Sequence, residues 1–128
     1  MPFATTQRDY ITLPAGEDLV QNRLVELRSD GVYYAPVDTT GQNYNIAGVT
    51  LIDASGGDPV SLALIGSTTS LVEASAAISV GDLLTRAGSG KVKEATSGDL
   101  IVGQALTAAE NGSICECQLS PAGWGQAV

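Results

Sequence analysis

The sequence contains no histidine in its 128 residues, and this absence removes most familiar catalytic chemistry. Histidine is the commonest general base and metal ligand, and it activates the nucleophile in many serine and cysteine hydrolases. The only other soft ligands are Cys115 and Cys117, and two thiolates are too few to hold a structural zinc ion. We therefore expect a protein without enzyme activity, without a metal and without a cofactor.

The sequence also lacks a pair of cysteines suited to a disulfide bond, because its two cysteines are only two positions apart on one predicted strand. Strand geometry does not allow such a pair to bridge without strain. We expect Cys115 and Cys117 to be reduced, metal-free and buried on one face of a sheet, where free cysteine acts as a small apolar side chain. Free thiols of this kind indicate synthesis in a reducing cytoplasm.

Clusters of basic residues are missing as well. The chain has six Lys and Arg against 14 Asp and Glu, which gives a net charge of −8. Binding to nucleic acid or to an anionic membrane surface needs grouped Lys and Arg, so we expect neither as a partner. The start of the chain has no basic and apolar signal pattern, and no apolar run approaches the ~18 residues of a membrane span.

Aromatic residues make up only 5% of the chain, so its core must be built from Val, Leu, Ile and Ala. Fifteen glycines, several of them in turn-forming pairs, interrupt the sequence before any helical period is established. The length is that of one domain. We expect a single all-β domain over residues 1–128, folded as a small β-barrel or sandwich.

The sequence does contain an internal repeat, with residues 16–66 as the first motif copy and residues 78–121 as the second. Each copy carries a hairpin, a polar loop, an apolar strand, a glycine turn and a last apolar strand. The alignment places Gly48 on Gly103, Gly57 on Gly112 and Val60 on Cys115 at one constant offset, and in the earlier part it places Leu24 on Leu84. We predict two degenerate copies of a β-hairpin-rich motif, related by an approximate internal two-fold axis. The alternative is a chance alignment of two turn-rich β segments.

The first 13 residues are predicted to form an extended N-terminal arm, and residues 122–128 a tail without period. Phe3 is the only phenylalanine of the chain and lies in a polar segment, where an aromatic side chain is suited to anchor in a partner's pocket. Extended backbone in this arm is also suited to add as a strand to a sheet edge. The candidate contact residues are Phe3, Thr5, Thr6, Arg8 and Tyr10. The alternative is a disordered terminus.

Three aspartates, Asp38, Asp53 and Asp58, are the remaining candidates for chemistry, either as paired carboxylates or as Ca²⁺ ligands. They lie in turn-prone segments, where an Asp side chain commonly caps the backbone of its own turn. The glycine pairs at 56–57 and 88–90 are not followed by a helix that starts with Lys and Ser or Thr, so neither is a phosphate loop. We interpret both sets as turn residues.

Residues 81–96, Gly-Asp-Leu-Leu-Thr-Arg-Ala-Gly-Ser-Gly-Lys-Val-Lys-Glu-Ala-Thr, and residues 101–119, which contain Val-Gly-Gln-Ala-Leu and end in Cys-Glu-Cys-Gln-Leu, resemble the capsid cement or decoration proteins of tailed bacteriophages. Residues 18–66 resemble a second, degraded instance of the same unit. The resemblance implies a structural virion protein that binds the outside of a phage capsid and stabilises capsomer junctions. It also implies the major capsid protein as partner, and self-association on the particle as a homotrimer.

The alternative function is a phage tail or baseplate module, or a receptor- or carbohydrate-binding β module. Such modules usually expose aromatic side chains on which sugars stack. The candidates for that role here are Tyr33, Tyr34, Tyr44 and Trp124, and their small number weighs against it. A small hydrolase or metal-dependent enzyme is a third alternative, and the lack of histidine weighs against that one.

Overall fold

A computed structural model of the chain describes residues 10–37, 46–65 and 69–119, and within them every regular element is a β-strand. The all-β expectation is therefore confirmed. In this described part, no helix is present that is long and apolar enough to cross a membrane. The strands are β1 (Tyr10–Pro14), β2 (Leu24–Arg28), β3 (Gly31–Tyr34), β4 (Gly48–Thr50), β5 (Pro59–Ala63), β6 (Ser70–Glu73), β7 (Leu83–Gly88), β8 (Lys91–Glu94), β9 (Gly103–Ala105) and β10 (Ile114–Leu119).

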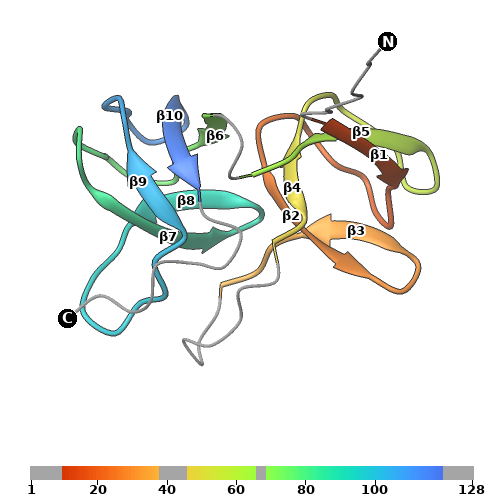
Figure 1. Cartoon of the computed structure of the whole chain (residues 1–128), viewed down its shortest axis with the longest axis horizontal. Helices are drawn as coiled ribbons and strands as arrows, with labels where there is room; N and C mark the ends of the chain where they lie inside the picture. Colours follow the sequence, from red (N-terminus) through yellow and green to blue (C-terminus); the bar gives the residue numbers. More distant parts are fainter. Residues whose placement is uncertain (1–9, 38–45, 66–68, 120–128) are drawn as a thin grey trace, which may run out of the picture.

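The strands form two five-stranded sheets with the same internal order. The first sheet runs β1-β5-β4-β2-β3 and the second runs β6-β10-β9-β7-β8, so each strand of the first has a counterpart five places later in the chain. We call β1–β5 the first repeat and β6–β10 the second repeat. The two repeats lie side by side along the long axis of the molecule (Figure 1). The predicted duplication is confirmed.

Each sheet curls so that its two edge strands approach each other. These are β1 and β3 in the first sheet and β6 and β8 in the second. Ala15, directly after β1, forms a parallel bridge with Val32 of β3, and Ala74 forms the same bridge with Val92 of β8. Among the described strands neither sheet closes into a barrel, so the architecture is sandwich-like. Strands β4 and β5 lie in the interior of their sheet, where each is paired on both sides.

The repeats begin earlier than the predicted copies 16–66 and 78–121, because each sheet starts with a short edge strand that lies before those boundaries. Tyr10 to Pro14 pair with β5 in antiparallel register, from Tyr10 opposite Ala63 to Pro14 opposite Pro59. The predicted arm 1–13 is therefore wrong for residues 10–13, which belong to the first sheet.

The predicted alignment of Leu24 with Leu84 is wrong by one residue. Leu24 lies opposite Val49 in β4, and the residue at the same place in the second repeat is Leu83, opposite Gln104 in β9. The cause is a β-bulge in β7 between Arg86 and Gly88, which adds one residue before the hairpin turn. The constant offset predicted for the later part, with Gly48 on Gly103, agrees with the pairing.

The apolar core is divided between the repeats unequally. The first repeat encloses a small cluster of its own, made of Ala15, Leu19, Val25, Val32, Val60 and Leu62. The second repeat encloses a larger cluster that includes Leu84, Val92, Cys115 and Cys117. Three residues of the first repeat, Leu24, Ala35 and Val49, belong to this second cluster. The outer face of the first sheet is therefore packed against the second repeat.

The contact between the repeats joins unlike surfaces, and the predicted two-fold axis is wrong for this reason. Leu24 N donates to Gly90 O at 2.7 Å, and Glu73 N donates to Asn22 O at 2.9 Å. Under a two-fold axis, each bond across the contact would occur twice. Leu83 is the counterpart of Leu24 and Asp30 is the counterpart of Gly90, so Leu83 N would donate to Asp30 O. Among the described residues no such bond exists. The repeats are stacked head to tail.

The outer faces of the two sheets differ in polarity. Cross-strand partners place side chains on the same face, so the equivalent positions follow from the pairing. The equivalent residues are Leu24 and Leu83, Val49 and Gln104, and Ala63 and Gln118. Leu24 is fully buried beneath the second repeat, whereas Leu83 is 37% exposed on a face that also presents two glutamines.

Candidate functional site

Of the predicted contact residues, Phe3, Thr5, Thr6 and Arg8 lie outside the described residues, as do Asp38 and the tail. Tyr10 is the one that the structure places. It is the first residue of β1, at the edge of the first sheet, and it is 52% exposed. An exposed aromatic side chain at a free sheet edge is available to a partner.

Beside Tyr10 lies a hollow of about 310 Å³ between the outer face of the first sheet and strand β6. We call it the junction hollow. Its apolar lining consists of Tyr10, Val49, Leu51, Ala63 and Leu71. The remaining lining residues are Asn22, Thr50, Thr69 and Ser70, so no charged side chain lines it. Because Leu51 is 46% exposed and Leu71 51% exposed, the rim of the hollow is apolar and open to solvent.

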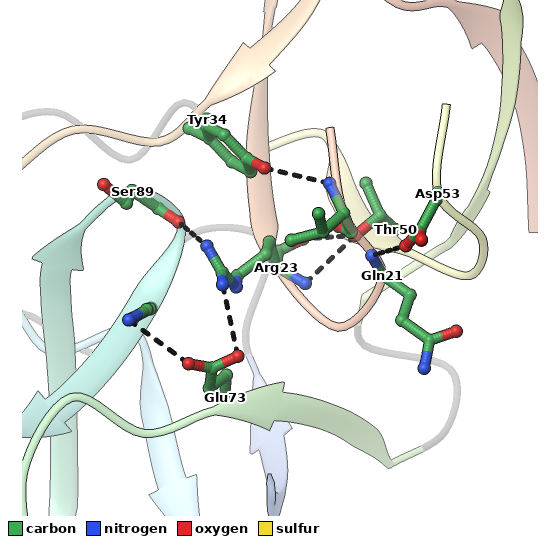
Figure 2. Close-up of polar contacts among 9 residues, drawn as sticks. Gln21, Arg23, Tyr34, Thr50, Asp53, Glu73 and Ser89 are labelled. Carbon is green, nitrogen blue, oxygen red and sulfur yellow. Dashed lines mark hydrogen bonds and ion pairs between the residues drawn. The ribbon is translucent and has the colours of Figure 1, made fainter. Parts of the chain in front are cut away.

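Arg23 is the central polar residue of the contact between the repeats (Figure 2). It lies just before β2, and its guanidinium crosses to the second repeat. One terminal nitrogen donates to the backbone oxygen of Ser89 at 3.0 Å, and the other donates to the Glu73 carboxylate at 3.2 Å. The Arg23 side chain is 14% exposed, which shields both contacts from water.

Glu73 receives a second cation, since Lys91 Nζ lies 3.2 Å from its other oxygen. Burial on its own raises the pKa of Glu73, but the hydrogen bond from Lys91 and the charge of Arg23 outweigh that effect. The pKa of Glu73 is therefore held below its ordinary value. The carboxylate remains charged at neutral pH and connects two strands of the second repeat to the first.

The segment that carries Arg23 is fixed from within the first repeat. Thr50 Oγ1 accepts a hydrogen bond from Arg23 N at 3.0 Å and donates to Val20 O at 2.6 Å. The Tyr34 hydroxyl accepts from Val20 N at 2.9 Å, and the Arg23 guanidinium lies 5.6 Å from the centre of the Tyr34 ring. These bonds hold the wall of the junction hollow in place, because Thr50 is also part of its lining.

A comparison with protein families places the chain. The family described as phage cement protein matches residues 4–119, which is most of the sequence and includes both repeats. The chain belongs to the phage cement protein family. It is a structural protein associated with the capsid of a bacteriophage.

A solved structure with a similar fold is the crystal structure of the N base of head fiber gp8.5 in bacteriophage phi29. The similarity covers 93% of this chain and 97% of that chain, with a TM-score of 0.72 and 20% sequence identity. At that identity the likeness concerns the fold. A search among curated proteins gave no significant match.

The two cysteines of this cement protein are free and buried in the core of the second repeat, on the same face of β10, as the sequence predicts. Burial raises the pKa of the Cys117 thiol to about 12, and burial also raises the pKa of Cys115. Both thiols are therefore protonated at neutral pH. Within the described ranges, no group of three or more His, Cys, Asp or Glu residues is placed to hold a metal ion.

The candidate aspartates that the structure describes act as turn residues in this cement protein. Asp53 Oδ1 accepts a hydrogen bond from Gln21 N at 2.8 Å, which fixes the turn before β2. Asp58 takes part in a turn through its backbone, where its N–H bonds to Ser55 O and its carbonyl accepts from Ala15 N. Gly57 has a φ of 92°, a backbone conformation that suits glycine in a tight turn.

The tyrosines proposed for sugar stacking have other roles in the cement protein. The Tyr34 hydroxyl is used by Val20, and the ring of Tyr33 is covered by Arg28, whose guanidinium lies 4.3 Å from the ring centre. Tyr44 and Trp124 lie outside the described residues. The described tyrosines 33 and 34 therefore do not form an open aromatic platform, which weakens the alternative of a carbohydrate-binding module.

Sequence reasoning missed both the Arg23–Glu73–Lys91 network and the junction hollow. These residues are far apart in the chain and come together only when the repeats stack. One signal was present. Arg23 is a charged residue directly before an apolar strand, and its counterpart in the second repeat is Asp82 rather than another base. That asymmetry between equivalent positions marks a residue with a role in one repeat only.

Proposed function

We propose that this chain binds the outer surface of an assembled phage capsid and stabilises the junctions between capsomers, with the major capsid protein as its partner. Membership of the cement protein family supports a role on the capsid. The observation that carries the proposal is the open apolar rim of Tyr10, Leu51 and Leu71, whose exposed fractions are 52%, 46% and 51%. Large apolar side chains gathered around one hollow are typical of an interaction surface.

The role proposed is purely structural, without catalysis. Two of the described acidic residues have structural roles. Asp53 caps a turn, and Glu73 is held between Arg23 and Lys91. A protein that acts by covering a seam between other subunits needs a surface of suitable shape and charge, and it needs no reacting group.

We further propose that residues 1–9 contribute to the capsid contact, with Phe3, Thr5, Thr6 and Arg8 as contact residues beside Tyr10. This segment leads directly into β1, whose outer edge is not paired to another strand in the described sheet. An extended segment at such an edge adds main-chain hydrogen bonds to the side-chain contacts.

On the particle we propose that three copies associate as a homotrimer on the exterior of the virion, after synthesis in the host cytoplasm. The proposal rests on the family resemblance. Each copy has a net charge of −8, so the free protein has little tendency to associate non-specifically. Joined on a capsid, several weak contacts act at high effective concentration and stabilise the shell together.

The test is a decoration assay with capsids of the parent phage that have been purified without this protein. Added protein is expected to bind to saturation, to appear as density on the capsid exterior in electron cryomicroscopy, and to raise the temperature at which the capsids release their DNA. An unrelated acidic protein of similar size and charge is the control. Density inside the shell or on the tail, or no binding at all, would contradict the proposal.

A further inference from the structure

The junction hollow has the properties of a binding pocket that is already formed. It holds about 310 Å³, and its lining contains apolar and uncharged polar residues in the proportions expected of a pocket for an apolar group. Its walls are fixed from both repeats, since Val49 belongs to the shared core and Thr50 is hydrogen-bonded to Val20. A side chain that enters the hollow therefore needs no rearrangement of the walls.

A buried polar atom in the hollow lacks a partner. Ser70 is 3% exposed and lines the hollow, and in the described part of the chain its Oγ makes no hydrogen bond. Buried hydroxyl groups in proteins are nearly always hydrogen-bonded, because leaving one unpaired is costly. A backbone amide or carbonyl of a bound segment that reaches this atom would satisfy it.

Among the described residues, the charged side chain that bonds to a side chain of the lining is acidic. Thr69 Oγ1, on the lining, donates to the Glu116 carboxylate at 2.9 Å. Arg23, which follows Asn22 of the lining, is already paired with Glu73. An apolar hollow with an acidic border is complementary to an apolar side chain flanked by basic residues.

The edge of the first sheet provides a path for the backbone of such a ligand. Strand β1 lies at the end of its sheet, and Tyr10, Ile11 and Thr12 are all exposed. An extended segment that adds to this edge can place a side chain in the hollow beside Tyr10. The same edge continues toward residues 1–9, the segment expected to contact the capsid.

We propose that the junction hollow receives one aliphatic or aromatic side chain from an extended segment of the capsid protein, with Lys or Arg close to it in that segment. This inference rests on the proposed function. The acidic border favours a segment with clustered Lys or Arg over a second copy of this chain, which has six such residues against 14 Asp and Glu. The hollow thereby gives the capsid contact its specificity.

Two variants test this. Leu51 lines the hollow and is 46% exposed, whereas Val80, in the turn before β7, is 67% exposed and lies outside the lining. Leu51→Lys places a positive charge beside the expected basic flank, and Val80→Lys introduces the same charge at an exposed apolar residue that is not part of the hollow.

In the decoration assay, Leu51→Lys is expected to raise the Kd for capsids at least tenfold, and Val80→Lys to change it less than twofold. Leu71→Lys, at a second rim position that is 51% exposed, is expected to act like Leu51→Lys and covers the case in which the first variant folds poorly. Binding of the intact protein is expected to weaken as NaCl is raised from low to high concentration. If both rim variants decorate capsids as tightly as the intact chain, the hollow is not the contact, while the proposed function stands. If the intact chain does not bind, both proposals fall.

The identity of the occupant is tested by a photo-crosslinking amino acid in place of Tyr10. Irradiation of decorated capsids is expected to join it to one peptide of the capsid protein that contains an apolar residue close to Lys or Arg. An adduct with residues 1–9 of the same chain, or with a second copy, would identify a different occupant and overturn the proposal.

Discussion

Arg23 shows how much a single side chain contributes to the contact between the repeats. Its guanidinium reaches Glu73, the backbone of Ser89 and the ring of Tyr34. The ion pair is largely shielded, with side-chain exposures of 14% and 21%. A shielded charge that loses its partner is costly, whereas an exposed ion pair contributes little. The energetic effect of substitutions is therefore expected to concentrate at this network.

Glu73→Gln is predicted to lower the free energy of unfolding by about 1–3 kcal/mol, because Arg23 and Lys91 lose their shared counter-charge. Glu110→Gln, on an exposed turn, is the control and is expected to cost less than about 0.5 kcal/mol. Urea unfolding at pH 7 measures both. Equal effects of the two substitutions would contradict the role of the network.

The same carboxylate predicts a dependence on pH. The pKa of Glu73 is lower in the folded chain than in the unfolded one, so its contribution is present above the unfolded value of about 4.3 and is lost as the pH falls through the folded pKa. Between pH 6 and pH 3 the intact chain is expected to lose more stability than Glu73→Gln does. Parallel curves for the two proteins would show that Glu73 does not contribute to this loss.

The Cys117 thiol is expected to give the opposite dependence, in which stability falls as the pH rises. Burial holds its pKa at about 12, whereas the unfolded thiol ionises near pH 8.5, so stability is expected to fall as the pH rises above about 8.5. Cys117→Val should cost less than about 1.5 kcal/mol at pH 7, because size and polarity are nearly kept, and should flatten the alkaline loss. Iodoacetamide should label the folded chain slowly and the unfolded chain quickly. Rapid labelling of the native protein at pH 8 would contradict this.

At the scale of the elements, strand β1 marks where pairing with the first sheet begins, at Tyr10. Deleting residues 2–9 is predicted to leave the thermal transition nearly unchanged, since pairing with β5 starts at Tyr10. The same deletion should weaken capsid binding at least tenfold, which corresponds to ~1.4 kcal/mol. Deleting residues 2–14 is the comparison, and it should also lower the melting temperature because β5 loses its partner strand. If the shorter deletion binds capsids as well as the intact chain, the contact lies entirely on the folded part.

The sequence was sufficient to predict the features of the fold that depend on local residue patterns. Glycine turns and apolar runs located most of the strands, and the offset between Gly48 and Gly103 established the duplication. It failed where one residue changes the register, since the bulge between Arg86 and Gly88 leaves the turn signals on either side intact. It also failed for contacts between the repeats. The position of Arg23 against Glu73, and with it the junction hollow, depends on how two finished sheets pack, and no local spacing encodes that packing.

For the whole molecule, the shared core predicts cooperative unfolding as a single domain. Leu24, Ala35 and Val49 of the first repeat complete the apolar cluster of the second. The second repeat alone would expose this cluster to water. We expect one calorimetric transition whose van't Hoff and calorimetric enthalpies agree. Residues 69–128 expressed alone should not fold. Two resolved transitions, or an independently folded second half, would contradict the prediction.

The unlike outer faces of the two sheets limit how many repeats can stack head to tail. A head-to-tail contact between similar modules has no built-in end, because each added module offers the surface that received the previous one, and the result is an open fibre. Here the residues at the two outer ends of the pair differ from those at the contact, so a further unit does not fit. Gln104 and Gln118 stand where Val49 and Ala63 accept the next unit, and Asp30 stands where Gly90 lets the backbone of Leu24 approach. The duplication therefore gives a defined pair of repeats, because this contact does not continue from one copy of the chain to the next.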